Sequence, residues 1–387
     1  MVLTGLDTFL HKGQSGCLGR VAVVANIASV DRSLKYTPCA LQDVGLDVRM
    51  VFTPEHGFFQ TAGYMAPVDE ENRICGLPLI SLYGNTKQDL SIPTEMMDQF
   101  DCLIFDLQDV GTRCYTYLSH LVLLMRQFSG TNKRILVLDR PNPIGGMQVE
   151  GPPLVKSYES FVGMLPVPMR HGLTAGEAAN MVMTIEDLAV DMTVVPMQGW
   201  KRDMMFHETG LPWIPASPNM PTLNTALVYP GMVFLEATNV SEGRGTTTPF
   251  GLFGAPFIRD PDALAGHLND YGLPGVYFRP VFFKPRFDKF KNQTCGGCAI
   301  HVTNSIKFHP VLTGLLIISV LRDSFADFRF PDRPYEFDDR GALRLLSGDD
   351  TVYGFLSGNV DFHTLKDYFH TREREFLQIR REFLLYD

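Results

Sequence analysis

Short, nearly unbroken apolar runs alternate with amphipathic stretches along the first half of the chain. Five such runs end in polar or turn residues, and they cover residues 21–30, 47–52, 78–84, 101–111 and 134–143. Between them lie helical patterns such as PTEMMDQF and TYLSHLVLLMRQF. Continuous apolar strands separated by helices are typical of a parallel sheet covered on both faces. We therefore predict a Rossmann-like, doubly wound, mostly parallel α/β sheet.

The pattern continues for one more helix and strand and then changes. The helix LTAGEAANMVMTIEDL is expected to begin at a capping box formed by Thr174 and Glu177, and DMTVVPM supplies the strand. Beyond residue 256 come GVYFRPVFFKP, CAIHVTN and the helical segments PVLTGLLIISVLRDSF and HTLKDYFHTREREFLQIRREF. This mixture predicts a smaller α+β domain. We expect residues 1–252 to form the Rossmann-like catalytic domain, and residues 253–387 to form an auxiliary domain that supplies the other wall of a cleft.

The composition is that of an ordinary globular protein, with 387 residues, 45% hydrophobic and 20% charged. A net charge of −9 argues against a nucleic-acid or anionic-membrane partner, because both would need a basic face. The longest apolar run, residues 311–321, is too short for membrane insertion. The first residues, MVLTGLDTFLHKG, lack a signal-peptide pattern, so we expect either a cytoplasmic protein or an exported one whose signal lies outside this sequence.

The sequence carries no motif for a metal or nucleotide cofactor. Seven cysteines, at positions 17, 39, 75, 102, 114, 295 and 298, are odd in number and scattered, which does not suggest a disulfide framework and favours a reducing compartment. A zinc site at CGGC (295–298) would need a second pair of ligands at matching spacing. The chain has no G-x-G-x-x-G, no P-loop and no G-x-S-x-G elbow. We expect no cofactor and no metal.

Polar side chains follow three of the predicted strands. Glu55 and His56 follow the second strand in FTPEHGFFQ, where Pro54 fixes φ and Gly57 tolerates unusual backbone conformations. The other candidates are Asp106, Gln108, Arg113 and Tyr115 after the fourth strand, and Asp139, Arg140 and Asn142 after the fifth. Ligands of open α/β sheets bind beyond the carboxyl ends of the strands. Strand-end aspartates often cap helices, but DRPNP contains no helix start, so a rim of site residues is the favoured interpretation.

Two later segments add amide, carboxylate and guanidinium groups. LPWIPASPNMPTL (211–223) holds Asn219, and FLEATNVSEGRGTTTPFGLFGAPF (234–257) holds Asn239, Glu242 and Arg244. Long ordered loops in compact chains are usually functional. Aromatic surface beside amide and carboxylate groups suits a sugar, which has an apolar ring face and a hydroxyl edge.

Several of these segments resemble one known family. PEHGF, FDLQDVGTRCYTY, LDRPNPIGG with VEGP, SFVG, PVPMRHGLTAGEAA, LPWIPASPNMPTL, VYPG and SEGRGTTTPF are similar, in this order, to the exo-β-N-acetylmuramidases, long grouped as a domain of unknown function. The resemblance covers most of residues 50–257 and is looser beyond. It implies a Rossmann-like domain, a smaller C-terminal domain and a cleft between them. It also implies release of N-acetylmuramic acid from the non-reducing end of peptidoglycan fragments, with Glu55 as the leading catalytic carboxylate.

Glycosidases commonly pair a general acid with a second carboxylate that acts as nucleophile or base. Glu55 is our candidate acid, and Asp106 and Glu242 are the candidates for the second group. A third route uses the 2-acetamido carbonyl of the sugar itself. His56 belongs either to the catalytic group or to the core, bonded to backbone.

Selectivity for N-acetylmuramic acid needs a cation for its lactyl carboxylate, and arginine offers a bidentate fork. Arg113, Arg140 and Arg244 are the candidates, each with a structural salt bridge as the alternative. Tyr115 and Tyr117 stand two apart at a helix start, so we expect only one to face the cleft. The full set of expected substrate contacts is Gln108, Arg113, Tyr115, Asp139, Arg140, Asn142, Asn219, Asn239 and Arg244.

Two other functions fit the same rim. A non-catalytic protein that binds muramyl sugars or acidic glycans would hold such a ligand without releasing product. A carboxylate-dependent lyase or epimerase would give a product other than the free hexose. Release of chromophore from a muramic acid glycoside, and the mass of the product, distinguish these alternatives from a hydrolase.

Overall fold

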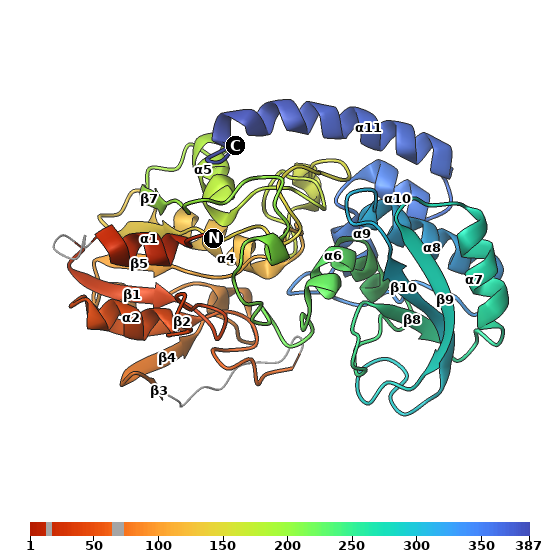
Figure 1. Ribbon diagram of the computed structural model, residues 1–387, viewed down its shortest axis with the longest axis horizontal. Coiled ribbons are helices and arrows are strands. Elements are labelled where there is room, and N and C mark those ends of the chain that lie inside the picture. Colours follow the sequence, from red (N-terminus) through yellow and green to blue (C-terminus); the bar gives the residue numbers. More distant parts are fainter. Residues whose placement is uncertain (13–17, 64–72) are drawn as a thin grey trace.

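The computed structural model describes residues 1–12, 18–63 and 73–387, and it consists of two packed parts (Figure 1). The first is built on a seven-stranded sheet in the order β3-β4-β2-β1-β5-β6-β7. Its strands are β1 (Arg20–Val24), β2 (Asp47–Thr53), β3 (Arg73–Ile74), β4 (Leu77–Ser81), β5 (Cys102–Phe105), β6 (Arg134–Leu138) and β7 (Asp191–Val195). All neighbouring pairs are parallel except β3 with β4. The prediction of a mostly parallel, doubly wound sheet is confirmed.

Alternate residues of each strand feed two apolar layers, which explains the unbroken hydrophobic runs. On one face, Val21 and Val23 of β1 belong to a cluster that includes residues of α1 (Gly5–Lys12) and α2 (Thr37–Asp43). On the other face, Ala22 and Val24 belong to a larger cluster with α4 (Thr116–Phe128) and α5 (Ala175–Ile185). The short helix α3 (Thr94–Met97) precedes β5. Burial on both sides is what a parallel sheet requires.

The second part is a three-stranded antiparallel sheet with helices, in agreement with the expected smaller α+β unit. Its strand order is β8 (Leu252–Ala255), β10 (Cys295–Val302) and β9 (Val276–Phe283). Its helices are α6 (Leu223–Met232), α7 (Pro261–Asp270), α8 (Pro310–Ser324), α9 (Gly341–Ser347) and α10 (Asp350–Leu356). Helices α6 and α8 cross at Gly231 and Gly314, where a Cβ on either residue would collide with the backbone of the other. Short 3₁₀ segments are η2 (Lys87–Leu90), η3 (Lys156–Tyr158), η4 (Phe206–Glu208) and η5 (Val233–Ala237).

The long helix α11 (Phe362–Ile379) runs from the second part back across to the first, and η6 (Arg380–Phe383) follows it (Figure 1). Arg380 then donates hydrogen bonds to the carbonyl oxygens of Gly146 and Gly172. The hydroxyl of Tyr386 donates to Asp139 at 2.6 Å. These contacts fasten the end of the chain to the rim of the parallel sheet, so α11 links the second part to the first.

Local features test two further expectations. The predicted capping box is present: the backbone N–H of Thr174 donates to Glu177, and Thr174 accepts from the N–H of Glu177. The cysteine expectation was wrong for one pair, because Cys39 and Cys75 form a disulfide. The two cysteines are 36 residues apart along the sequence, and this separation gave no indication that Cys39 in α2 and Cys75 just after β3 lie close together.

The remaining cysteines that the structure describes are unpaired, and Cys17 lies outside the described residues. Both cysteines of CGGC lie inside β10. Among the described residues, no three His, Cys, Asp or Glu side chains are grouped to hold a metal ion. In the same part of the chain, no helix has the length and apolar character needed to cross a bilayer.

Candidate active site

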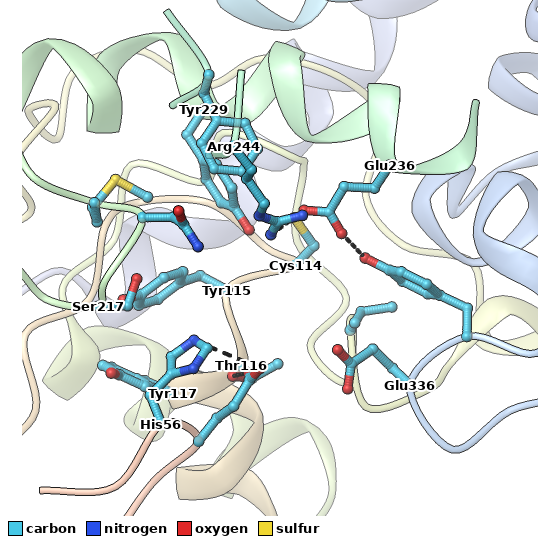
Figure 2. A pocket seen from close by; sticks show the side chains of 16 residues that line it. His56, Cys114, Tyr115, Thr116, Tyr117, Ser217, Tyr229, Glu236, Arg244 and Glu336 are labelled. Carbon is cyan, nitrogen blue, oxygen red and sulfur yellow. Dashed lines mark hydrogen bonds and ion pairs between the residues drawn. The ribbon is translucent and has the colours of Figure 1, made fainter. Parts of the chain in front are cut away.

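A pocket of about 510 Å³ lies between the carboxyl end of the parallel sheet and the second part (Figure 2). Strands β2 and β4 lie on one side of β1 in the sheet. The chain then crosses to the other side of β1, where β5 pairs with it, so the strand order reverses between β1 and β5. Such a reversal is where open α/β sheets bind ligands. Glu55 and His56 reach the pocket from the loop after β2, and Tyr115 and Tyr117 reach it from the segment after β5.

The PEHG segment is a tight turn that presents two side chains to the pocket. The N–H of Gly57 donates to the carbonyl oxygen of Pro54 at 3.0 Å, and His56 and Gly57 both have positive φ, 73° and 76°. The hydroxyl of Thr116 donates to Glu55 Oε2 at 3.3 Å, and His56 Nε2 lies 3.6 Å from Glu55 Oε1. The turn therefore sets Glu55 between a hydroxyl and an imidazole.

His56 unites the two alternatives that the sequence left open. Its Nδ1 lies 3.2 Å from the carbonyl oxygen of Ala62, so the ring is fixed by backbone, yet it also lines the pocket. A neutral imidazole that donates from Nδ1 presents the lone pair of Nε2 to Glu55. The ring therefore stands beside the carboxyl group of Glu55, with 3.6 Å between Nε2 and Oε1.

A second carboxyl group enters the pocket from the other part of the molecule. Glu336 is 2% exposed, and the hydroxyl of Tyr83 donates to its Oε2 at 3.0 Å. Burial, and then the negative charge of Glu55, raise the pKa of Glu336 well above its usual value. Glu336 therefore keeps its proton to higher pH than an ordinary glutamate does. Figure 2 shows its carboxyl group pointing toward Thr116.

Three residues that line the pocket have backbone conformations that are unfavourable for side-chain-bearing residues. The φ values are 73° for His56, 60° for Phe250 and 47° for Glu336. Each such residue costs on the order of 1–3 kcal/mol and persists only where its surroundings impose it. Phe337, next to Glu336, packs against Tyr83 with 5.3 Å between ring centroids, which helps to hold that loop. Clustering of strained residues at one pocket is typical of functional sites.

The opposite wall is aromatic and bears one guanidinium group. Tyr229 stacks edge-on with Tyr115 and with Phe250, at 6.0 and 4.8 Å between centroids. Arg244 lies 5.0 Å over the ring of Phe250 and pairs with Glu236 at 2.7 Å. Figure 2 shows the guanidinium beside Tyr229, facing Glu236.

Behind Arg244 the charges continue into an adjoining hollow, which Glu242 and Lys289 line together with Arg244 and Glu236. Arg244 is 3.2 Å from Glu242, and Lys289 is 2.9 Å from it. Burial alone would raise the pKa of Glu242, but the charges of Lys289 and Arg244 lower it below its usual value. Glu242 is thus an ionised partner in a cluster of charges.

The expectation for the two tyrosines was wrong, because Tyr115 and Tyr117 both line the pocket. Tyr115 is the residue that precedes α4 and has an extended backbone, φ −77° and ψ 116°. Helical spacing therefore does not apply to it, and the two rings pack together at 4.7 Å between centroids.

The structure brings together only some of the expected site residues. Glu55, His56, Tyr115, Asn219 and Arg244 line the pocket. Glu242 lines the adjoining hollow, and Gln108 and Arg140 line a separate depression beside Phe206. Asp106 is fully buried and accepts hydrogen bonds from Arg140 (2.5 and 2.8 Å) and from the hydroxyl of Thr37. Asp106 and Arg140 therefore form a structural ion pair beneath the sheet rim.

The remaining expected contacts are engaged in holding loops. Asp139 accepts hydrogen bonds from Thr174, the N–H of Gly176 and Tyr386. Asn142 donates to the carbonyl oxygen of Leu173, and Asn239 exchanges hydrogen bonds with the backbone of residues 327 and 329. Gln108 donates to the carbonyl oxygens of Asp109 and Pro141. These side chains shape the rim without lining the pocket.

Arg113 is buried between the two parts and serves as a carbonyl clamp. Its guanidinium donates to the carbonyl oxygens of Leu346 (2.9 Å), Ser347 (3.4 Å) and Val167 (3.4 Å). Gly348, at the end of α9 with φ 67°, leaves the space that this guanidinium occupies. Burial lowers the pKa of Arg113 to about 10, so the group stays charged at neutral pH.

Replacing Arg113 by methionine is therefore expected to destabilise the protein by about 2–5 kcal/mol, because several buried carbonyl oxygens lose a charged donor. Thermal unfolding measures the effect, with Arg374→Met on the exposed side of α11 as the matched control. If the variant has an unchanged melting temperature but an altered sugar selectivity, then Arg113 contacts the substrate, as expected from the sequence.

Sequence reasoning missed several residues that line the pocket, among them Glu336, Tyr335, Tyr229 and Thr116. The motif GTRCYTY contained a signal for Thr116, since its neighbours were already candidates. Glu336 had none, because it stands in an irregular loop of the second part, 281 residues after Glu55 along the chain.

Comparisons with known proteins agree over the whole chain. Residues 21–224 match the model described as exo-β-N-acetylmuramidase NamZ, N-terminal, and residues 227–386 match the corresponding C-terminal model. The peptidoglycan β-N-acetylmuramidase NamZ of Bacillus subtilis (strain 168) is 38% identical over 392 residues, covering 100% of this chain and 91% of that protein.

Two crystal structures of DUF1343 family proteins from Bacteroides fragilis NCTC 9343 have the same fold. Their TM-scores are 0.88 and 0.76 at 31% and 28% identity, and each match covers 100% of this chain and 99% of the solved one. The N-terminal and C-terminal family models thus both match this chain, and solved members of the family share its fold. The chain also has a pocket lined by carboxyl groups between its two parts. The chain belongs to the NamZ family of exo-β-N-acetylmuramidases.

Proposed function

We propose that this chain is an exo-acting glycoside hydrolase that releases N-acetylmuramic acid from the non-reducing end of peptidoglycan fragments. The observation that carries this proposal is the pair of carboxyl groups, Glu55 and Glu336, that reach one pocket from the two parts of the molecule. We place the division between the catalytic and auxiliary domains near residue 252, where β8 begins the second sheet. Helix α6, which comes before this point in the sequence, already packs against α8 of the second part.

The two carboxyl groups have complementary roles in this proposal. Glu336, which burial and the charge of Glu55 keep protonated, donates its proton to the leaving glycosidic oxygen. Glu55, supported by Thr116 and His56, acts on the sugar side, as nucleophile or base or by orienting the 2-acetamido group. This reassigns the acid role that the sequence favoured for Glu55, and it replaces Asp106 and Glu242 as the second group, because both are held in ion pairs.

The rest of the pocket suits one amino sugar. Tyr115, Tyr229 and Phe250 offer apolar faces for the ring, and Asn219 and Ser217 offer hydrogen bonds for its hydroxyl and acetamido groups.

Among the three candidate arginines, Arg244 is the one that lines this pocket, and we assign it the lactyl carboxylate. Glu236 and Glu242 already pair with Arg244, so a lactyl carboxylate that binds there must share the guanidinium with them. Their negative charges therefore weaken its binding. Tyr335, which donates to Glu236, helps to hold that carboxylate in place.

Arg244→Lys is expected to narrow the preference for a muramic acid glycoside over the matching N-acetylglucosamine glycoside by roughly tenfold or more. Lysine preserves a positive charge for Glu236 and Glu242 but lacks the bidentate fork. The measurement is the ratio of the two specificity constants. Arg140→Lys, in an ion pair outside the pocket, is the control. An unchanged ratio of specificity constants in Arg244→Lys would mean that the guanidinium does not recognise the lactyl group.

The function itself is tested with a chromogenic N-acetylmuramic acid glycoside and with the natural disaccharide. Release of chromophore and of free N-acetylmuramic acid, identified by mass, is the expected result. Tight binding without release would identify a binding protein, and a product that lacks the elements of water would identify a lyase.

A further inference from the structure

A wide groove continues from the pocket along the junction of the two parts. One side of the groove is lined by residues 60–63, Pro218, Asn219 and Pro221, and the other by Thr246, Thr247, Pro249, Phe287 and Asp288. Its volume is about 1430 Å³, against about 510 Å³ for the pocket, and Asn219 lines both. The groove is therefore the open continuation of a smaller chamber.

Both walls of the groove are built rather than incidental. Gln60, at φ 57°, donates from Nε2 to the carbonyl oxygens of Pro215 (2.8 Å) and Ala216 (2.9 Å), which ties the first wall together. On the second wall, the N–H of Arg286 donates to the carbonyl oxygen of Gly245 at 2.8 Å. A Cβ at Gly245 would meet the backbone of Phe287, so glycine lets the two loops of this wall touch.

The chemistry of the groove differs from that of the other hollow that adjoins the pocket. That hollow is lined by charged side chains already paired with one another, among them Glu242, Arg244 and Lys289. The groove instead presents the ring of Phe287, which is 52% exposed, beside the hydroxyl groups of Thr246 and Thr247. A neutral sugar has an apolar face and hydroxyl edges that match an aromatic ring and small polar groups.

We propose that this groove is the binding site for the leaving part of the substrate, the N-acetylglucosamine unit next to the scissile bond and the sugars that follow it, with Phe287 as the stacking platform. The inference rests on the proposed function. An exo-acting enzyme holds one terminal sugar in a closed pocket, so the rest of the substrate must extend along an open path. Among the described residues the groove provides such a path, and Asp288, which also lines the charged hollow, is the one charged side chain in its lining.

The test compares two substrates that share the terminal sugar. One is the β-methyl glycoside of N-acetylmuramic acid, which places no second sugar in the groove, and the other is the N-acetylmuramyl-N-acetylglucosamine disaccharide. Phe287→Ala is expected to lower the specificity constant for the disaccharide by about three- to tenfold while leaving the methyl glycoside unchanged. Thr247→Trp, which fills the groove, is expected to have a larger effect of the same kind.

Phe282→Ala is the matched control, because Phe282 is also exposed (63%) but lies on β9 outside the groove. If Phe287→Ala and Thr247→Trp change both substrates equally, or neither, the groove does not bind the leaving sugars. If the wild-type protein releases no muramic acid from either substrate, the proposed function fails and the groove assignment fails with it.

Discussion

Glu55→Gln is expected to keep the fold and lose nearly all turnover, by roughly a hundredfold to ten-thousandfold. Glutamine matches glutamate in shape and keeps an oxygen to accept the hydrogen bond from Thr116. It carries no negative charge and cannot act as a nucleophile or base on the sugar. The specificity constant for release of muramic acid measures the effect.

A matched control separates chemistry from folding. Glu95→Gln makes the same change on the exposed helix α3, away from the pocket, and is expected to have wild-type activity. The melting temperatures of both variants should stay close to that of the wild type. Turnover near the wild-type value in Glu55→Gln would remove Glu55 from the mechanism.

The same variant also probes the link between the two carboxyl groups. The negative charge of Glu55 is one cause of the raised pKa of Glu336. Removing that charge should lower the pKa of Glu336, so the alkaline limb of any residual activity should move to lower pH. A residue with a purely structural role would not produce this shift.

The parallel sheet could be predicted from the sequence because its strands are buried on both faces. Residues 21–24 and 134–138 are apolar without interruption, and the helices between the strands have clear amphipathic periods. Most of the first domain thus follows from local patterns. The PEHG turn could also be predicted, because Pro54 and Gly57 delimit it. Its side chains Glu55 and His56 do line the pocket.

What the sequence could not provide are the partners of buried polar groups. Asp106 and Asp139 both end strands, yet Asp106 pairs with Arg140 and Asp139 binds Tyr386 from the last residues of the chain. A strand-end carboxylate looks the same in sequence whether it faces solvent, substrate or a structural partner. Only tertiary contacts distinguish these cases.

The second carboxyl group was missed for a related reason. Glu336 stands in the irregular segment PDRPYEFDDR, where no period or motif marks it. Its role follows from three-dimensional contacts with Tyr83 and from its proximity to the charge of Glu55. The disulfide between Cys39 and Cys75 escaped prediction in the same way.

Glu336→Gln is expected to lower turnover by a factor similar to that of Glu55→Gln, because glutamine cannot donate a proton to the leaving oxygen. The activity of this variant should also depend differently on pH. In the wild type, the active form carries the proton on Glu336, so activity falls as pH rises through its raised pKa. The residual activity of Glu336→Gln should lack this alkaline limb.

Stability offers an independent check with a defined sign. In the unfolded chain a glutamate ionises near pH 4.5, whereas folded Glu336 keeps its proton to higher pH. Above pH 4.5 the folded state therefore binds more protons than the unfolded state, and the free energy of unfolding decreases as pH rises. Glu336→Gln, neutral at every pH, should lose this contribution to the slope.

Glu150→Gln is the matched control, because burial also raises the pKa of Glu150, to about 8, but this residue does not line the pocket. Its backbone contact, from the N–H of Leu312, survives in glutamine. The control should flatten the dependence of stability on pH and leave both turnover and its pH profile unchanged. If Glu336→Gln behaves like Glu150→Gln, keeping full activity and its alkaline limb, then the proton for the leaving oxygen comes from another group, and the assignment of Glu336 as the general acid is wrong.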